Sequence, residues 1–294
     1  MYDLKALYEA TTVEEAVALR VAHPDAHIIA GGTDVLVQMR EGKRAGVELI
    51  SIHGIEALEG VSLDADGNLR IGSLTTFSHI TSHPLIQEHC NVLGEAVDQV
   101  GGPQIRNVGT IGGNTCNGVT SADSASTLFA YDAQVELTGS NGVRTVPISE
   151  FYIKAGTVDL KADEIQTAII IPADSFANTK GHYIKYAMRN AMDIATLGTS
   201  VNVRLSADGK VVERVRIAFG VAGPIPVRAV KAEALAVGEL LTPALIDTVA
   251  KAVLQDINPR DSWRASKAFR SHIAVESTKR AFEESVKLLG GQMV

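Results

Sequence analysis

The 294-residue chain contains only two cysteines, Cys90 and Cys116, and no Cys-X-X-Cys pair. Two thiols cannot build a disulfide framework, so a disulfide-stapled secreted fold is excluded and a cytoplasmic protein is expected. No stretch reaches the roughly 18 consecutive apolar residues of a membrane span. The segment Met1–Ala10 carries acidic residues and lacks the apolar run that is typical of a signal peptide.

Aromatic residues are also scarce, at 5% of the chain with a single tryptophan, whereas 26 residues are glycine. The 27 Lys and Arg residues face 34 Asp and Glu residues, which gives a net charge of −7. No basic stretch could follow a phosphate backbone, so nucleic acid is not an expected partner. An apolar content of 46% is typical of a globular chain with a substantial core.

The first 52 residues predict the order helix, strand, helix, strand. Thr12 and Glu15 have the spacing of a capping box at the start of the first helix. The predicted elements are a helix at 13–22, a strand at 27–30, a helix at 35–40 and a strand at 48–52. Parallel pairing of the two strands through a right-handed crossover is the expected topology.

The pattern changes after residue 55, and a polar linker at 173–180 precedes a third pattern. Between residues 55 and 172 the sequence predicts a strand at 69–74, helical periodicity at 85–100, a loop at 101–118, a helix at 123–131, and strands at 135–138, 143–147 and 164–171. A hairpin turn at Ser140-Asn-Gly142 is expected between the strands at 135–138 and 143–147. Three antiparallel strands are predicted at 182–188, 196–205 and 211–222, followed by a helix at 243–254 and a final helix carrying Val275, Phe282, Val286 and Leu289 on one face. The fold class is therefore α+β, with sub-domains at 1–54, 55–176 and 177–294.

Two glycine-rich segments stand out. In Ile28–Val35 an apolar strand meets Gly31-Gly32, and a helix opens at Thr33 or Asp34. Glycine lets the backbone approach a ligand closely, and the amides at a helix N-terminus attract an anion. This pattern favours a diphosphate cradle, although a plain strand-to-helix turn remains an alternative for this segment taken alone.

The second segment, Gly101–Gly118, has six glycines in 18 residues, interleaved with hydrogen-bonding side chains. Gly112-Gly113 would allow close backbone approach, and Thr110 and Asn114 could bond sugar or phosphate oxygens; the alternative is an irregular surface crossover. Together the two segments predict a large, phosphate-bearing cofactor between two sub-domains. The chain has no Gly-X-Gly-X-X-Gly motif and no Walker A motif, which disfavours a nicotinamide Rossmann site and a P-loop.

The motifs Ala30-Gly-Gly-Thr-Asp34 and Gln104-Ile-Arg-Asn-Val-Gly-Thr-Ile-Gly-Gly-Asn114 resemble those of the FAD-binding subunits of molybdenum hydroxylases. The resemblance extends to Thr120–Ser124, Lys185–Arg189 and Trp263–Arg270, and within the family it is greatest to the separate FAD subunits of bacterial xanthine dehydrogenases. It implies a two-part FAD-binding fold of the vanillyl-alcohol-oxidase type in the first two sub-domains and a C-terminal flavoprotein domain with a three-stranded antiparallel sheet and helices.

The resemblance also implies which residues bind FAD. Two segments match the loops around the diphosphate, Ile165 and Val35 match apolar positions beside the isoalloxazine ring, and Asp123 matches an acidic position near the ribityl chain. The implied FAD-binding residues are His27, Ile28, Ile29, Ala30, Gly31, Gly32, Thr33, Asp34, Val35, Gly109, Thr110, Ile111, Gly112, Gly113, Asn114, Asp123, Ile165, Ile184 and Lys185. Some relatives have an aromatic residue where this chain has Val100, so the ring packing is expected to differ.

No catalytic acid, base or nucleophile is expected in this chain, because the flavin carries the redox chemistry. The resemblance implies that a large subunit oxidises the substrate at a molybdopterin cofactor. The electrons then pass through iron–sulfur clusters of a small subunit to FAD in this chain, and from FAD to NAD⁺. Two cysteines cannot hold an extra iron–sulfur cluster here, and Pro84 disfavours a metal site at His79 and His83. The alternatives are a sibling hydroxylase acting on nicotinate, carbon monoxide or an aromatic-CoA substrate, and a non-enzymatic nucleotide-binding module.

Overall fold

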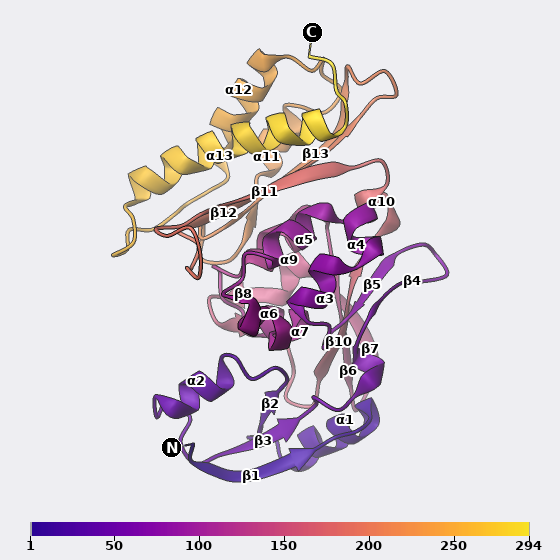
Figure 1. Cartoon of the computed structure of the whole chain (residues 1–294), viewed down its shortest axis with the longest axis vertical. Helices are drawn as coiled ribbons and strands as arrows, with labels where there is room; N and C mark the ends of the chain where they lie inside the picture. The colour runs from indigo at the N-terminus through magenta and orange to yellow at the C-terminus, as the bar shows by residue number, and fades with distance from the viewer. Residues whose placement is uncertain (1, 294) are drawn as a thin grey trace.

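Three β-sheets of three to five strands follow one another along the long axis of the molecule. The computed structural model describes residues 2–293, with the N-terminal sheet at one end and the C-terminal helices at the other (Figure 1). None of the helices within these residues is both long enough and apolar enough to cross a membrane.

The N-terminal sheet is parallel and has the strand order β1-β3-β2. Its elements are β1 Leu4–Glu9, α1 Val13–Ala22, β2 His27–Ile29, α2 Val35–Arg40 and β3 Val47–Ser51. The predicted parallel pairing of the second and third strands is confirmed. The sequence prediction missed β1, because its exposed leucines, Leu4 and Leu7, break the period-two alternation of a half-buried strand.

Helix α1 begins where the capping pattern placed it. The Thr12 hydroxyl accepts a hydrogen bond from the Glu15 amide at 3.1 Å, which satisfies one of the free N–H groups of the first turn. The Glu15 carboxylate accepts from the amide of Thr11 at 2.8 Å rather than from the amide of Thr12. The hydrogen bonds that the carboxylate accepts from the amide and hydroxyl of Thr11 lower the pKa of Glu15.

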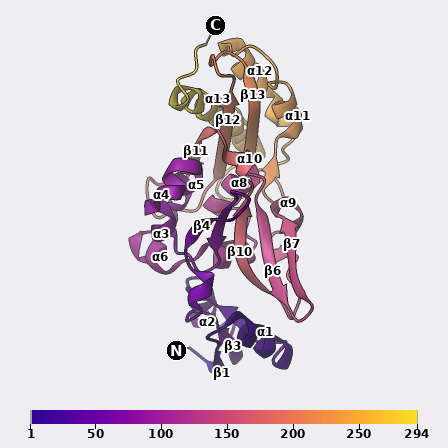
Figure 2. The same ribbon diagram turned by 90° about the vertical axis from the view of Figure 1, so that its right-hand side faces the viewer.

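The middle sheet has five antiparallel strands in the order β4-β5-β10-β6-β7. The middle unit contains η1 Glu56–Leu58, β4 Val61–Leu63, β5 Leu69–Gly72, α3 Phe77–Ser82, α4 Pro84–His89, α5 Asn91–Val97, α6 Pro103–Val108, α7 Ile111–Cys116, α8 Asp123–Ala130, β6 Gln134–Gly139, β7 Gly142–Pro147, α9 Ile148–Phe151, β8 Tyr152–Lys154, β9 Thr157–Val158 and β10 Ile165–Ile171. Strands β8 and β9 form a separate two-stranded sheet. One face of this sheet is buried beneath the helices, and its buried side chains include Leu69, Ile71, Val135 and Ile169. Figure 2 shows β6, β7 and β10 reaching down toward α1 of the N-terminal unit.

One sequence prediction for this region was wrong, and another was confirmed apart from one break in the helix. The segment 101–118, predicted as a loop, folds into α6 and α7, because Pro103 occupies the first turn of α6 and Thr110 caps α7. The periodic segment 85–100 contains two helices, α4 and α5, separated at Cys90, whose backbone leaves the helical region.

The C-terminal sheet is antiparallel in the order β11-β12-β13-β14, so a short fourth strand joins the three that the sequence predicted. Its elements are α10 Ala173–Phe176, β11 Lys180–Tyr186, β12 Leu197–Leu205, β13 Val212–Gly220, β14 Val227–Arg228, α11 Val230–Ala234, α12 Pro243–Ala252, η2 Val253–Gln255 and α13 Lys267–Leu288. Helix α13 lies close on β12, since the small side chains of Ser277 and Ser285 bond Thr199 at 2.7 Å and the Val201 carbonyl at 3.1 Å.

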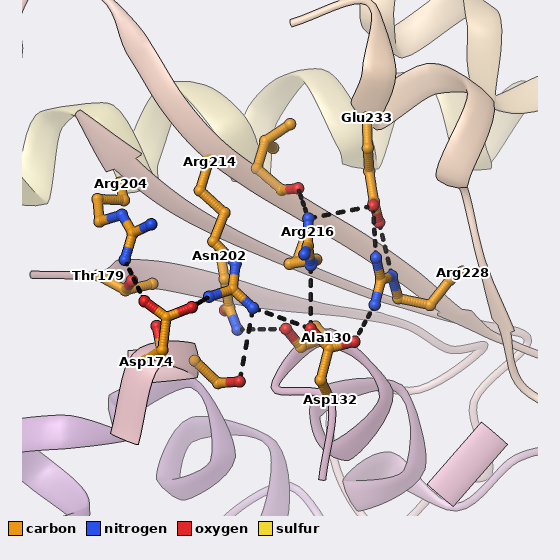
Figure 3. Close-up of polar contacts among 12 residues, drawn as sticks. Ala130, Asp132, Asp174, Thr179, Asn202, Arg204, Arg214, Arg216, Arg228 and Glu233 are labelled. Atoms are coloured by element: carbon orange, nitrogen blue, oxygen red, sulfur yellow. Dashed lines mark hydrogen bonds and ion pairs between the residues drawn. The ribbon is translucent and has the colours of Figure 1, made fainter. Parts of the chain in front are cut away.

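A network of arginines on the C-terminal sheet holds that sheet on the middle unit (Figure 3). Asp132, at the end of α8, has a φ of 50° and accepts hydrogen bonds from Arg214 at 2.9 Å, from Arg216 at 3.1 Å and from Arg228. Asp174 accepts a second bond from Arg214, at 2.7 Å. One carboxylate thus orients three guanidinium groups across the junction.

We predict that Asp132→Asn lowers the free energy of unfolding by about 1–2 kcal/mol, the value of charge-assisted hydrogen bonds reduced for partial solvent exposure. Asparagine tolerates the positive φ, so the substitution removes charge without adding backbone strain. Chemical denaturation measures the loss. The control is Asp174→Asn, whose side chain is 77% exposed and whose loss should stay below about 0.5 kcal/mol. Equal losses in the two variants would contradict this account.

Candidate functional site

A cavity of about 460 Å³ lies between the N-terminal unit and the helices of the middle unit. That volume falls in the range of small-molecule sites. Its wall combines the turn between β2 and α2, one side of α7, and the start of β10. The two glycine-rich segments therefore meet at one cavity, as their composition predicted.

Gly31 is the point of closest contact between these segments. A Cβ atom at this position would lie 1.7 Å from the carbonyl oxygen of Val108 at the end of α6, so only glycine fits. Gly32 has a φ of +73°, which side-chain-bearing residues rarely adopt. Beyond it, the Asp34 carboxylate accepts a hydrogen bond from Asn117 at 3.0 Å and makes no capping bond to α2. Asp34 thus ties the first segment to the second instead of capping the helix.

The turn before α2 presents free hydrogen-bond donors. Within residues 2–293, the amides of Gly31, Gly32 and Thr33 donate no hydrogen bond to the protein, and all three residues line the cavity. Unpaired N–H groups next to a helix start favour an anionic ligand. The chemistry of this turn fits a diphosphate.

The second glycine segment contributes differently. The amides of Ile111 and Gly112 donate to the carbonyls of Thr75 at 3.1 Å and Ser73 at 2.9 Å, and the Gly113 amide donates to the Thr110 hydroxyl at 3.1 Å. Because these donors are already used, this segment offers few amides to a ligand. Its glycines instead allow close packing, since a Cβ on Gly112 would lie 2.6 Å from the Cβ of Ser73.

Two arginines of the N-terminal unit place positive charge at the cavity wall. Arg20 and Arg44 line the wall beside His27. Arg20 donates to the Ala26 carbonyl at 2.6 Å, and Arg44 donates to the side chain of Gln38. Burial, and then the charges of Arg44 and Arg20, lower the pKa of His27, so its imidazole is mainly neutral near pH 7. The two guanidinium groups therefore supply the charge that an anionic ligand requires.

Gln166, the second residue of β10, forms a polar part of the wall. Its side-chain oxygen lies 2.8 Å from the Thr115 hydroxyl and 3.0 Å from the Cys116 sulfur. Burial raises the pKa of the Cys116 thiol to about 12, so it stays protonated. The Cys116 thiol is therefore a small, protonated group that fills space on the wall and is not a reactive thiolate.

A buried ion pair lies behind the cavity wall. The Lys185 ammonium bonds the Asp123 carboxylate at 2.8 Å and the Gln99 carbonyl at 2.9 Å, and each of the two charged side chains is 7% exposed. The Tyr183 hydroxyl donates to the same carboxylate at 2.7 Å. Burial raises the pKa of Asp123, and the Lys185 charge opposes that rise. The pair joins β11 to α8, and the Gln99 carbonyl that Lys185 bonds belongs to the residue before Val100, a wall residue.

Most of the implied FAD-binding residues lie on the cavity wall, and the others lie elsewhere. Ile111 is fully buried in the core, and Ile184 packs against the C-terminal core. The residues on the wall are His27, Ile28, Ala30, Gly31, Gly32, Thr33, Asp34, Val35, Gly109, Thr110, Gly112, Gly113, Asn114 and Ile165; Ile29, Ile111, Asp123, Ile184 and Lys185 do not line it.

Sequence reasoning missed several wall residues, among them Arg20, Arg44, Ser73, Phe77 and Gln166. Arg20 and Arg44 read as ordinary surface charges, since nothing local relates them to the glycine turn. Gln166 carried a usable signal, because it and Thr167 interrupt the apolar run of a central strand.

Two family models together span most of the chain. Residues 2–174 match the family described as FAD binding domain in molybdopterin dehydrogenase, and residues 182–285 match the CO dehydrogenase flavoprotein C-terminal domain. The chain belongs to the family of FAD-binding domains of molybdopterin dehydrogenases.

Similar proteins agree with this assignment. The chain is 42% identical over 293 residues, covering 100% of both chains, to the putative xanthine dehydrogenase FAD-binding subunit of Escherichia coli (strain K12). It is 34% identical to the nicotinate dehydrogenase FAD-subunit of Eubacterium barkeri, covering 81% of this chain and 84% of that one. The solved carbon monoxide dehydrogenase of Hydrogenophaga pseudoflava superimposes with a TM-score of 0.90 at 30% identity, covering 97% of this chain and 98% of that one. The chain is therefore a FAD subunit of the molybdenum hydroxylase family.

We predict that Gly31→Ala prevents FAD retention and destabilises the protein by about 1–3 kcal/mol or more, because a methyl group would overlap the Val108 backbone. The measurements are the FAD-to-protein ratio after purification and the unfolding temperature. Gly54→Ala is the matched control, since its Cβ would meet only the Ala10 carbonyl at 3.9 Å. Full FAD content in Gly31→Ala would show that the close approach is not required.

Proposed function

We propose that this chain is the electron-transfer subunit of a xanthine dehydrogenase-type molybdenum hydroxylase, which receives electrons from iron–sulfur clusters and passes them through FAD to NAD⁺. The observation that carries the FAD part is the set of free amides at Gly31–Thr33 facing a cavity rimmed by Arg20 and Arg44. The full-length similarity to the Escherichia coli protein supports xanthine as the substrate of the complex.

Bound FAD supplies the redox chemistry, and the chain supplies binding, orientation and electrostatics. The amides of the β2–α2 turn donate to the diphosphate, and Arg20 and Arg44 neutralise its charge. Apolar wall residues, including Phe77, Val100 and Ile165, exclude water from the rings. The implied residues His27–Val35 and Gly109–Asn114 are proposed as FAD contacts on these grounds.

The proposed partners are a large subunit with the molybdenum cofactor and a small subunit with iron–sulfur clusters. The organisation of the related dehydrogenases into named FAD subunits and medium chains supports these partners. A sibling hydroxylase acting on nicotinate is the second candidate, and its lower identity of 34% makes it the weaker one.

The deciding experiment purifies the complex through a tag on this chain and measures FAD content, co-purifying subunits and substrate oxidation. We expect one FAD per chain, flavin bleaching when xanthine is added without oxygen, and recovery of flavin colour with formation of NADH when NAD⁺ follows. A flavin-free chain that ADP does not stabilise would overturn the FAD assignment. Bleaching by nicotinate and not xanthine would overturn the substrate, and flavin that NAD⁺ does not reoxidise would overturn the acceptor.

Lys185 is proposed to hold positive charge near the flavin. We predict that Lys185→Met lowers the flavin midpoint potential by roughly 20 mV, the equivalent of about 1 kcal/mol in a two-electron couple, because a cation favours the reduced, more negative flavin. Spectroelectrochemical titration measures the shift.

Because Lys185→Met also leaves Asp123 unpaired in the interior, the double variant Lys185→Met, Asp123→Asn is the control for stability. The double variant should fold without a buried lone carboxylate. Because it removes both charges of the pair, a potential that falls in Lys185→Met and not in the double variant would assign the shift to the Lys185 charge. An unchanged potential together with unchanged NAD⁺ turnover would remove Lys185 from the proposal.

A further inference from the structure

Two buried side chains on the cavity wall have polar atoms without a partner in the protein. Gln166 is 4% exposed and Ser73 is 3% exposed, and both line the cavity. Within residues 2–293, neither the Gln166 side-chain nitrogen nor the Ser73 hydroxyl makes a hydrogen bond. Buried polar groups are normally paired, so two orphans on one wall indicate that an occupant of the cavity pairs with them.

A bulge in β10 accompanies Gln166. The register of β10 against β6 shifts between Gln166 and Ala168. Bulges re-aim side chains and recur next to functional sites. Gln166 lies between the buried residues Ile165 and Thr167, at the point where the pairing of β10 with β6 shifts.

The orientation of the Gln166 amide is set by helix α7. Its oxygen lies 3.0 Å from the Cys116 thiol, which donates to it. It also lies 2.8 Å from the Thr115 hydroxyl, which has one proton and is 3.0 Å from the carbonyls of Ile111 and Gly112 as well. Because the thiol is protonated and donates, the oxygen of the Gln166 amide faces Cys116. The NH₂ group is then the part of the side chain that is left for the cavity.

The free energy of this arrangement depends on what fills the cavity. An unpaired buried donor costs about 1–3 kcal/mol, and a ligand that brings an acceptor recovers that cost. The neighbouring wall residues Ile165, Leu160 and Cys116 are apolar or weakly polar, which suits a flat ring rather than a phosphate. The acceptor that matches is therefore a ring nitrogen or a ring carbonyl oxygen.

We propose that Gln166, together with Ser73, is a cofactor-contact residue that donates a hydrogen bond to a ring acceptor of the bound FAD. The inference rests on the proposed function, because it takes FAD as the occupant. Both rings of FAD carry such acceptors, so the shared chemistry is an N–H donor to a heteroaromatic ring, and half-ligands distinguish the isoalloxazine ring from the adenine ring.

The test uses the full-length chain stripped of flavin and titrated with FAD, FMN and ADP. Gln166→Met keeps the length of the side chain and removes the donor, and should raise the Kd for FAD about tenfold. If the isoalloxazine ring is the acceptor, FMN affinity falls in parallel and the visible flavin spectrum shifts. If adenine is the acceptor, ADP affinity falls and the spectrum does not change.

Gln134→Met is the matched control, since Gln134 lies on β6 of the same sheet and does not line the cavity. Its Kd for FAD should stay at the unsubstituted value. Ser73→Ala is a smaller change that should raise the Kd about threefold, and it serves as the readout if Gln166→Met does not fold.

The two possible failures are distinguishable. If the unsubstituted chain binds none of the three ligands, the proposed function fails with this inference. If the unsubstituted chain binds FAD, but Gln166→Met and Ser73→Ala bind it within twofold of the control and leave the spectrum unchanged, only the Gln166 contact is overturned.

Discussion

The approach of Gly31 to the end of α6 is the contact on which the candidate site depends. With 1.7 Å between a notional Cβ and the Val108 oxygen, no side chain can enter, and two backbone segments touch directly. This contact brings the β2–α2 turn of one unit beside α6 and α7 of the next, and the cavity opens along that seam. It also explains a composition rich in glycine and poor in aromatics, because the cavity is shaped mainly by main chain rather than by large rings.

The two glycine segments contribute to the cavity in different ways. Near Gly31 the amides are free and can meet an anion, whereas near Gly112 they are bonded to the strand beneath and serve packing. A chain with a net charge of −7 nevertheless presents Arg20 and Arg44 at this cavity, while burial and those two cations keep His27 mainly neutral. The cavity therefore has a cationic part and a largely apolar part, which is what the proposed FAD site requires.

The C-terminal unit contributes residues that lie outside the cavity lining. Asp132 gathers Arg214, Arg216 and Arg228 at the junction, which holds the C-terminal sheet on α8. The same sheet then delivers Lys185 to Asp123 and to the carbonyl next to Val100. Lys185 thus bonds a residue next to the cavity wall without itself lining the cavity.

Local chemistry in the sequence determined where the chain turns and which segments need glycine. The cap at Thr12, the hairpin at Ser140-Asn-Gly142 and the turn at Gly31-Gly32 are all signals between neighbouring residues, and each predicted its element correctly. Tertiary structure decided the rest. It paired β1 with β3, satisfied the α7 amides with carbonyls from another strand, and brought Arg20 and Gln166 to one cavity from positions 146 apart in the sequence. The partners in such contacts cannot be identified from local pattern, because they meet only when separate hydrophobic faces pack together.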